Sequence, residues 1–102
     1  MKIVVAEPGF AMPEIREIDG SLESMQEIVG GYIEVHYPWD MPCCLVCNED
    51  AERFGLPLNR LLRYDNGVYE IFRGTIFAVG IEGEEFASLT DTVAKMLQEV
   101  LY

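Results

Sequence analysis

The 102-residue chain has little positive charge. Lys and Arg together number 7 against 18 Asp and Glu, so the formal net charge is −11 at pH 7. Proteins that bind a nucleic-acid backbone neutralise its phosphates with Lys and Arg side chains. Because this chain offers so few of them, we expect no direct binding to a nucleic-acid backbone.

Long hydrophobic runs are also missing. No apolar stretch approaches the roughly 18 residues of a membrane-spanning helix, and the apolar run after Lys2 is too short for the core of a signal peptide. We therefore expect a cytoplasmic protein that does not contact a membrane. Hydrophobic residues nevertheless make up 50% of the chain, which excludes intrinsic disorder. Since no repeat or linker interrupts the sequence, we expect one domain over residues 1–102.

Cysteine is scarce, and its three copies lie close together as Cys43, Cys44 and Cys47. An odd, clustered set is not a disulfide framework. Cys44 and Cys47 have the spacing of a metal or redox pair, but no glycine or proline turns the chain between them. Residues three apart in a strand point to opposite faces. We therefore expect packing cysteines, with a metal or redox pair as the alternative, and we predict no metal site and no cofactor.

The pattern of apolar and turn residues predicts an α+β fold with a mainly antiparallel sheet. Residues 31–37 alternate, with Ile33, Val35 and Tyr37 on one face and His36 on the polar one, where it is expected to be solvated. Residues 49–63 are expected to be irregular and to lead into a short helical turn. Strands are predicted at 2–6, 14–18, 31–37, 43–48, 61–64, 68–72 and 74–81, with 31–37 and 43–48 paired as one hairpin and Asp65-Asn66-Gly67 turning another.

Two helices are predicted. A short one, at about 21–29, begins after Asp19-Gly20-Ser21 and ends at Gly30-Gly31. An amphipathic helix at about 88–101 begins with Ser88-Leu89-Thr90-Asp91, a variant of the capping box. The predicted apolar stripes are Leu22, Met25, Ile28 and Val29 in the first helix, and Leu89, Val93, Met96, Leu97, Val100 and Leu101 in the second.

The segment Gly55-Leu56-Pro57-Leu58-Asn59-Arg60 is the strongest candidate for binding. Glycine and proline fix its backbone path, Asn59 can bond to nearby backbone, and Arg60 offers a planar fork of donors. Two interpretations remain open. Either these side chains hold the fold together, or they bind an anionic or carboxylate-bearing partner.

Several segments together resemble a known family. They are Lys2–Gly9, Glu17–Glu23, Ile28–Glu34, Cys47-Asn48-Glu49, Gly55–Arg60 and Gly74–Gly80. In this order they are similar to the domain of unknown function 3846 family, whose members occur in phages, plasmids, integrative elements and their bacterial hosts. The family name carries no activity and no catalytic residues. The resemblance implies a small intracellular accessory protein of mobile-element origin.

Three functions are compatible with the sequence. The first is a non-enzymatic protein-binding module that uses Asn48, Asn59 and Arg60, because no catalytic constellation is present. The second is an acidic decoy that mimics DNA and occupies a host nuclease or regulator. The third is a small-ligand-binding protein or hydrolase with a pocket near Trp39, rimmed by Tyr37 and Asp40. We assign no catalytic residues, expect a protein partner and allow for a homo-oligomer.

Overall fold

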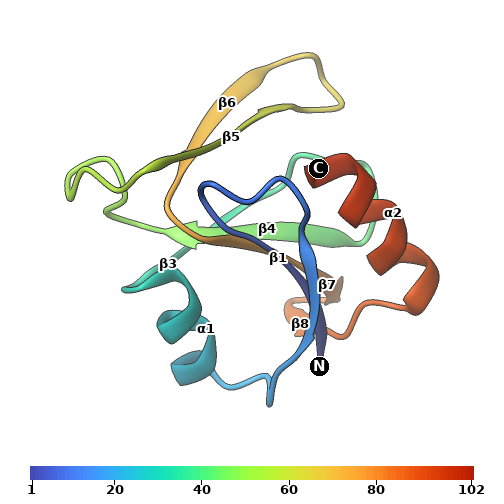
Figure 1. Cartoon of the computed structure of the whole chain (residues 1–102). Helices are drawn as coiled ribbons and strands as arrows, with labels where there is room; N and C mark the ends of the chain where they lie inside the picture. Colours follow the sequence, from blue (N-terminus) through green and yellow to red (C-terminus); the bar gives the residue numbers. More distant parts are fainter.

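The structure is a computed structural model that describes residues 1–102. It confirms the predicted α+β fold (Figure 1). Neither helix is long and apolar enough to cross a membrane. The elements in chain order are β1 (Lys2–Ala6), β2 (Glu14–Glu17), α1 (Leu22–Val29), β3 (Ile33–His36), β4 (Cys43–Asn48), β5 (Leu58–Arg63), β6 (Tyr69–Arg73), β7 (Ile76–Glu82), β8 (Glu85–Ala87) and α2 (Asp91–Leu101).

The main sheet has six strands in the order β2-β1-β7-β4-β3, and β8 pairs with β7. A separate two-stranded sheet is formed by β5 and β6. Every strand pair is antiparallel, as predicted. The hairpin predicted from residues 31–37 and 43–48 is confirmed, because β3 pairs with β4 along its length.

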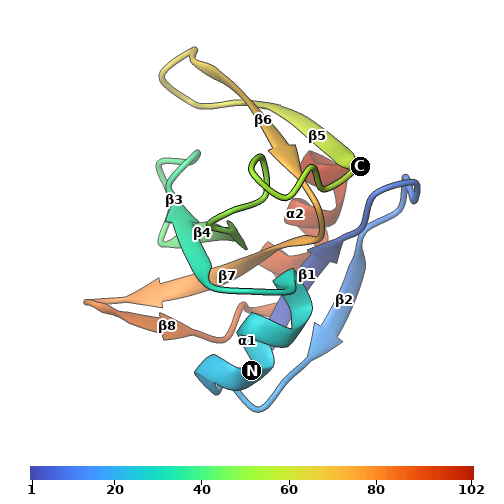
Figure 2. The ribbon, with the colours of Figure 1, turned by 90° about the vertical axis from the view of Figure 1, so that its left-hand side faces the viewer.

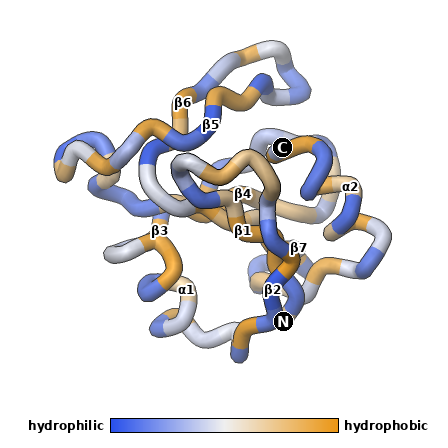
Figure 3. The backbone as a smooth tube through the Cα atoms, in the orientation of Figure 1, coloured by the Kyte–Doolittle hydropathy of each residue, from blue (hydrophilic) through white to orange (hydrophobic).

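Both faces of the main sheet are covered. Helix α1 lies on one face, and α2 and the β5–β6 hairpin lie on the other (Figures 1 and 2). For this reason the central strands β4 and β7 are apolar at nearly every position (Figure 3). In the hairpin, by contrast, exposed positions alternate with more buried ones from Leu61 to Arg63 and from Tyr69 to Phe72. The buried residues on the α1 side are Ile3, Val5, Met25, Val29, Cys44, Val46, Phe77 and Val79. Those on the α2 side include Val4, Ala6, Leu45, Cys47, Leu62, Phe72, Ile76, Ala78, Leu97 and Leu101.

Helix α1 forms where the sequence predicts it. The Ser21 hydroxyl caps its start by accepting from the Ser24 N–H at 3.1 Å. Gly30 ends it at a φ of 79°, a left-handed conformation that suits glycine. The predicted stripe is wrong for Leu22, which lies in the first turn and remains 56% exposed.

The N-cap of helix α2 lies two residues later than predicted, at Thr90 and not at Ser88. The cap is Thr90, whose hydroxyl accepts from the Val93 N–H at 3.2 Å. Ser88 instead accepts from the Lys2 N–H at 2.8 Å, so it joins the segment before α2 to β1. The helix buries Ala94, Leu97 and Leu101. The predicted stripe is therefore wrong for Met96 and Val100, which are exposed.

The prediction of an irregular segment over 49–63 holds only for its first part. Turns follow β4, but Leu58–Arg63 is a full strand. It pairs with Tyr69–Arg73 through a register shift between Leu58 and Arg60. The predicted turn at Asp65-Asn66-Gly67 closes this hairpin and is confirmed.

Candidate functional site

A cleft of about 350 Å³ lies between the β3–β4 edge of the main sheet and the β5–β6 hairpin. Four of its eleven lining residues are glutamates, so its walls favour cations. The lining residues come from β3, β4, the turn after β4, and β6. They are Glu34, His36, Cys47, Asn48, Glu49, Ala51, Glu52, Glu70, Ile71, Phe72 and Arg73.

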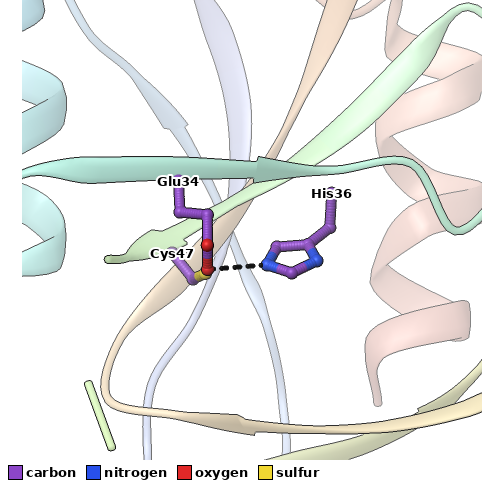
Figure 4. Close-up of side chains that lie close together, drawn as sticks. All are labelled: Glu34, His36 and Cys47. Carbon is purple, nitrogen blue, oxygen red and sulfur yellow. Dashed lines mark hydrogen bonds and ion pairs between the residues drawn. The ribbon is translucent and has the colours of Figure 1, made fainter. Parts of the chain in front are cut away.

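The pleat of two paired strands brings three of these side chains together. Glu34 and His36 are two residues apart on β3 and therefore share a face. Cys47 on β4 lies directly opposite Glu34 in the antiparallel register. The three side chains converge in the cleft (Figure 4), and one ligand atom from each lies within 4.8 Å of the others.

His36 is held on both of its ring nitrogens. Its Nε2 lies 3.0 Å from the Glu34 carboxylate. Its Nδ1 lies 3.2 Å from the Tyr64 hydroxyl and 3.4 Å from the Glu70 carboxylate. The Tyr64 hydroxyl in turn donates to Glu70. The expectation of a solvated histidine is therefore wrong, since only 20% of the His36 side chain is exposed.

The thiols separate as the strand geometry predicts. Cys44 packs on the α1 side of the sheet and Cys47 on the α2 side, and Cys43, Cys44 and Cys47 are all free and buried. Burial raises the pKa of Cys44 to about 12. Burial, together with the charges of Glu34 and Glu70, also raises the pKa of Cys47 to about 12. None of these thiols is activated for nucleophilic chemistry in this arrangement.

Asn48 and Asn59 bond to the backbone of their own chain. Asn48 is buried, and its amide donates to the Val29 carbonyl at 3.1 Å while its oxygen accepts from the Asp50 N–H at 2.7 Å. The Asn59 amide donates to the Ala6 carbonyl at 2.9 Å and to that of Gly74 at 2.8 Å. The Asn48 side chain therefore joins the end of β4 and the turn after it to the end of α1. The Asn59 side chain joins the hairpin to the end of β1 in the main sheet.

Arg60 bonds to four backbone carbonyls, three of them far away in the chain. Its Nε donates to Leu101 at 2.5 Å, and its Nη2 donates to Phe10 at 2.8 Å and to Ala11 at 3.0 Å. Desolvation lowers the pKa of its guanidinium. Of the two interpretations open for this segment, these contacts favour a side chain that holds the fold together. Arg60 connects the hairpin to the end of α2 and to the loop after β1.

Trp39 lies apart from the cleft. It is half-buried and packs against the core on the α2 side of the sheet. The backbone N–H of the neighbouring Asp40 donates to the Asp65 carboxylate at 2.7 Å, so this loop is tied to the turn of the hairpin. The structure thus does not bring Trp39 together with Asn48, Asn59 or Arg60 into one site.

A second surface, which the sequence did not predict, lies on the side of the hairpin that faces away from the core. Leu61 pairs with Ile71, and Arg63 pairs with Tyr69, so these four side chains are neighbours across the two strands. Leu61 is 62% exposed, Tyr69 62% and Ile71 57%. We call these four residues the hairpin outer face. The sequence carries no clear signal for this face, because apolar residues occupy both its exposed and its buried positions.

The chain matches one family model, described as Domain of unknown function (DUF3846), over residues 1–101. It therefore belongs to that family, as the resemblance in its sequence predicted. No curated protein matches the chain. No solved structure matches it either.

Proposed function

We propose that this member of the domain of unknown function 3846 family is a non-enzymatic protein-binding module that docks its partner on the hairpin outer face. The observation that supports it most is the adjacency of Leu61, Tyr69 and Ile71, each more than half exposed, on paired strands. Apolar side chains gathered on a surface mark interaction sites more often than scattered ones do. The proposal keeps the type of function expected from the sequence and moves its surface.

The hairpin presents this face in a fixed position. Leu62 and Phe72 alternate with the exposed residues and are buried against the main sheet, at 7% and 3% exposure. Arg60 and Asn59 add hydrogen bonds to the main body from the same strand. A surface that is already ordered loses little conformational entropy when a partner binds, which favours affinity.

The charge distribution indicates an acidic partner. Four of the seven cations and two of the eighteen acids lie in residues 53–73, so this segment carries +2 while the rest of the chain carries −13. Arg63 on the hairpin outer face has no carboxylate partner within the chain. Arg and Tyr are enriched at the centres of protein interfaces. The expected partner is a protein segment that combines aliphatic or aromatic side chains with carboxylates.

The other two functions have less support. A DNA-mimic decoy needs carboxylates in an uninterrupted array, and the basic segment 53–73 breaks any such array. For the ligand-binding alternative, Trp39, Tyr37 and Asp40 do not line the cleft beneath the hairpin. An accessory role in mobile elements, which the family resemblance in the sequence implies, stays part of this proposal, and binding a protein partner would be sufficient for it.

A random peptide library displayed on phage provides the test. Selection on the wild type is expected to enrich acidic peptides with aliphatic or aromatic residues. Their affinities are then measured by fluorescence anisotropy on purified protein. The double variant Leu61→Ser/Ile71→Ser is expected to bind the enriched peptides at least ~10-fold more weakly, because each truncated anchor at an interface costs about 1–2 kcal/mol.

A matched control separates a specific surface from general hydrophobicity. Tyr69→Ser is expected to reduce binding, whereas Tyr32→Ser, which removes an equally exposed tyrosine before β3, leaves it unchanged. Equal loss in the two variants, or enrichment of basic peptides, contradicts the proposal. A second copy of this chain could also occupy the hairpin outer face, and light scattering on the wild type tests this. If the wild type is a dimer and Leu61→Ser dissociates it, the proposed acidic foreign partner is wrong.

A further inference from the structure

Three different metal-binding atoms meet at one point of the cleft beneath the hairpin. The Glu34 carboxylate lies 3.0 Å from His36 Nε2 and 3.8 Å from Cys47 Sγ. All three atoms lie within 4.8 Å of one another. We propose that Glu34, His36 and Cys47 form a binding site for a divalent cation of the zinc class. This proposal does not depend on the docking function of the hairpin outer face.

The hydrogen bonds of His36 leave its Nε2 lone pair available. Tyr64 donates its hydroxyl proton to Glu70, so the Tyr64 oxygen can accept from the Nδ1–H of His36. In that tautomer Nε2 and the facing Glu34 oxygen are both acceptors. A cation beside them stabilises this arrangement, because both atoms then donate an electron pair to it. A metal ion can supply that charge; in the other neutral tautomer the Nε2–H of His36 donates to Glu34 instead.

The spacing of the three atoms suits tetrahedral coordination. Zinc bonds of about 2.0–2.3 Å at tetrahedral angles place ligand atoms about 3.3–3.8 Å apart. The two separations from the Glu34 carboxylate, 3.0 and 3.8 Å, lie at or near this range, and the third, between His36 and Cys47, is at most 4.8 Å. Small rotations of the Glu34 side chain, which is 50% exposed, can complete the geometry. Because all three residues line the cleft, solvent could supply a fourth ligand.

The surroundings of the imidazole match those of metal ligands. A histidine that binds a metal usually donates its other ring N–H to a carboxylate or a similar acceptor, which fixes the tautomer and the ring orientation. Glu70 and Tyr64 occupy this place beside Nδ1. Phe72 packs edge-on against the same ring and restricts its rotation further. Glu70 is therefore expected to be a positioning residue and not a ligand.

The ligand set selects the class of cation. One thiolate, one imidazole and one carboxylate suit Zn²⁺ and its analogues, whereas Ca²⁺ and Mg²⁺ require several oxygen ligands. Glu49 and Glu52 lie on the same cleft and increase the local concentration of cations. A bound divalent cation stabilises the thiolate of Cys47, so binding releases the thiol proton to solvent.

Cobalt(II) is the probe, because it reports thiolate coordination in its absorption spectrum. The full chain is first treated with a chelator and then titrated with cobalt(II). We expect one equivalent to bind with a thiolate-to-cobalt charge-transfer band in the near ultraviolet, and added zinc to displace it. Cys47→Ser is expected to abolish the band. Cys44→Ser, which alters an equally buried thiol on the opposite face of the sheet, is expected to keep it.

Two further variants keep the test decisive if Cys47→Ser unfolds. Glu34→Gln changes a half-exposed side chain and is expected to weaken cobalt binding while the circular dichroism spectrum stays unchanged. Glu70→Gln is expected to keep the charge-transfer band and weaken binding roughly 10–100-fold. A wild type without the band overturns the site, as does a band that survives in folded Cys47→Ser or an affinity that Glu34→Gln leaves unchanged.

Discussion

The His36 ring meets the Phe72 ring edge-on, with centroids 5.2 Å apart and ring planes at 90°. His36 belongs to β3 in the main sheet and Phe72 to β6 in the hairpin, so the contact joins two separate sheets. It holds the hairpin above the cleft. The proposed docking surface on one side of the hairpin and the proposed cation ligands beneath it lie on either side of this contact.

Removal of the Phe72 ring is expected to destabilise the protein by about 3–5 kcal/mol, because a buried aromatic side chain is lost and a cavity remains. Phe72 is 3% exposed and belongs to the core on the α2 side of the sheet. Urea denaturation of Phe72→Ala measures the effect. Ile71→Ala, at the neighbouring exposed position, is expected to change stability by no more than about 0.5 kcal/mol. Similar losses in the two variants would contradict the buried position of Phe72.

Arg60→Lys is expected to cost about 1.5–3 kcal/mol of folding stability, since a charged donor loses its carbonyl partners. Lysine carries one charged nitrogen and cannot reach both Leu101 and the Phe10-Ala11 segment. The denaturation midpoint is compared with that of Arg63→Lys, an exposed position on the same strand. If the two substitutions had the same small effect, Arg60 would not hold these segments together.

The buried thiols are expected to be inert in the folded protein. With the pKa of Cys44 and Cys47 raised to about 12, and that of Cys43 raised by burial, almost no thiolate forms at mildly alkaline pH. Ellman's reagent in a chelating buffer is therefore expected to label no cysteine until urea unfolds the chain. Rapid labelling of one thiol under native conditions would contradict this burial.

The Lys2–Asp91 pair, which joins β1 to the start of α2, predicts a pH-dependent stability. The hydrogen bond from Lys2 lowers the pKa of Asp91 below 3.8, and the same bond raises the pKa of Lys2 above 10.5. The stabilisation is thus fully present above pH 3.8 and below pH 10.5, and it is lost as pH falls through the lowered pKa or rises through the raised one.

A double-mutant cycle with Lys2→Met and Asp91→Asn isolates the interaction of this pair. The coupling between the two substitutions is expected to be favourable at neutral pH and to disappear in acid. Because Asp91 is exposed and Lys2 is only partly buried, the coupling is expected to shrink in high salt. A coupling of the same size at every pH would contradict an ionic origin.

Local patterns in the sequence predicted much of the fold. The alternation of Ile33 to His36 and the Asn66-Gly67 turn specified two hairpins. The divergence of Cys44 and Cys47 followed from the two-residue period of a strand. Each of these features involves residues close together in the chain, where geometry alone determines which side chains share a face.

Features that depend on distant residues were not predictable in this way. His36 was expected to be solvated. The local sequence does not show that Tyr64 and Glu70, which belong to a different hairpin, lie against its ring. Ser88 was expected to cap α2, but the N–H of Lys2 on β1 binds its hydroxyl. Arg60 had two open interpretations because its carbonyl partners come from both ends of the chain. No local pattern contains this information.

Chemical-shift mapping tests the proposed docking surface most directly. An acidic peptide enriched on the wild type is titrated into the ¹⁵N-labelled protein, and amide shifts are followed by nuclear magnetic resonance. We predict that the largest changes cluster at Leu61, Arg63, Tyr69 and Ile71 and disappear in the Leu61→Ser/Ile71→Ser variant. Changes centred on α1 or α2, with the hairpin outer face unaffected, would contradict the proposed function.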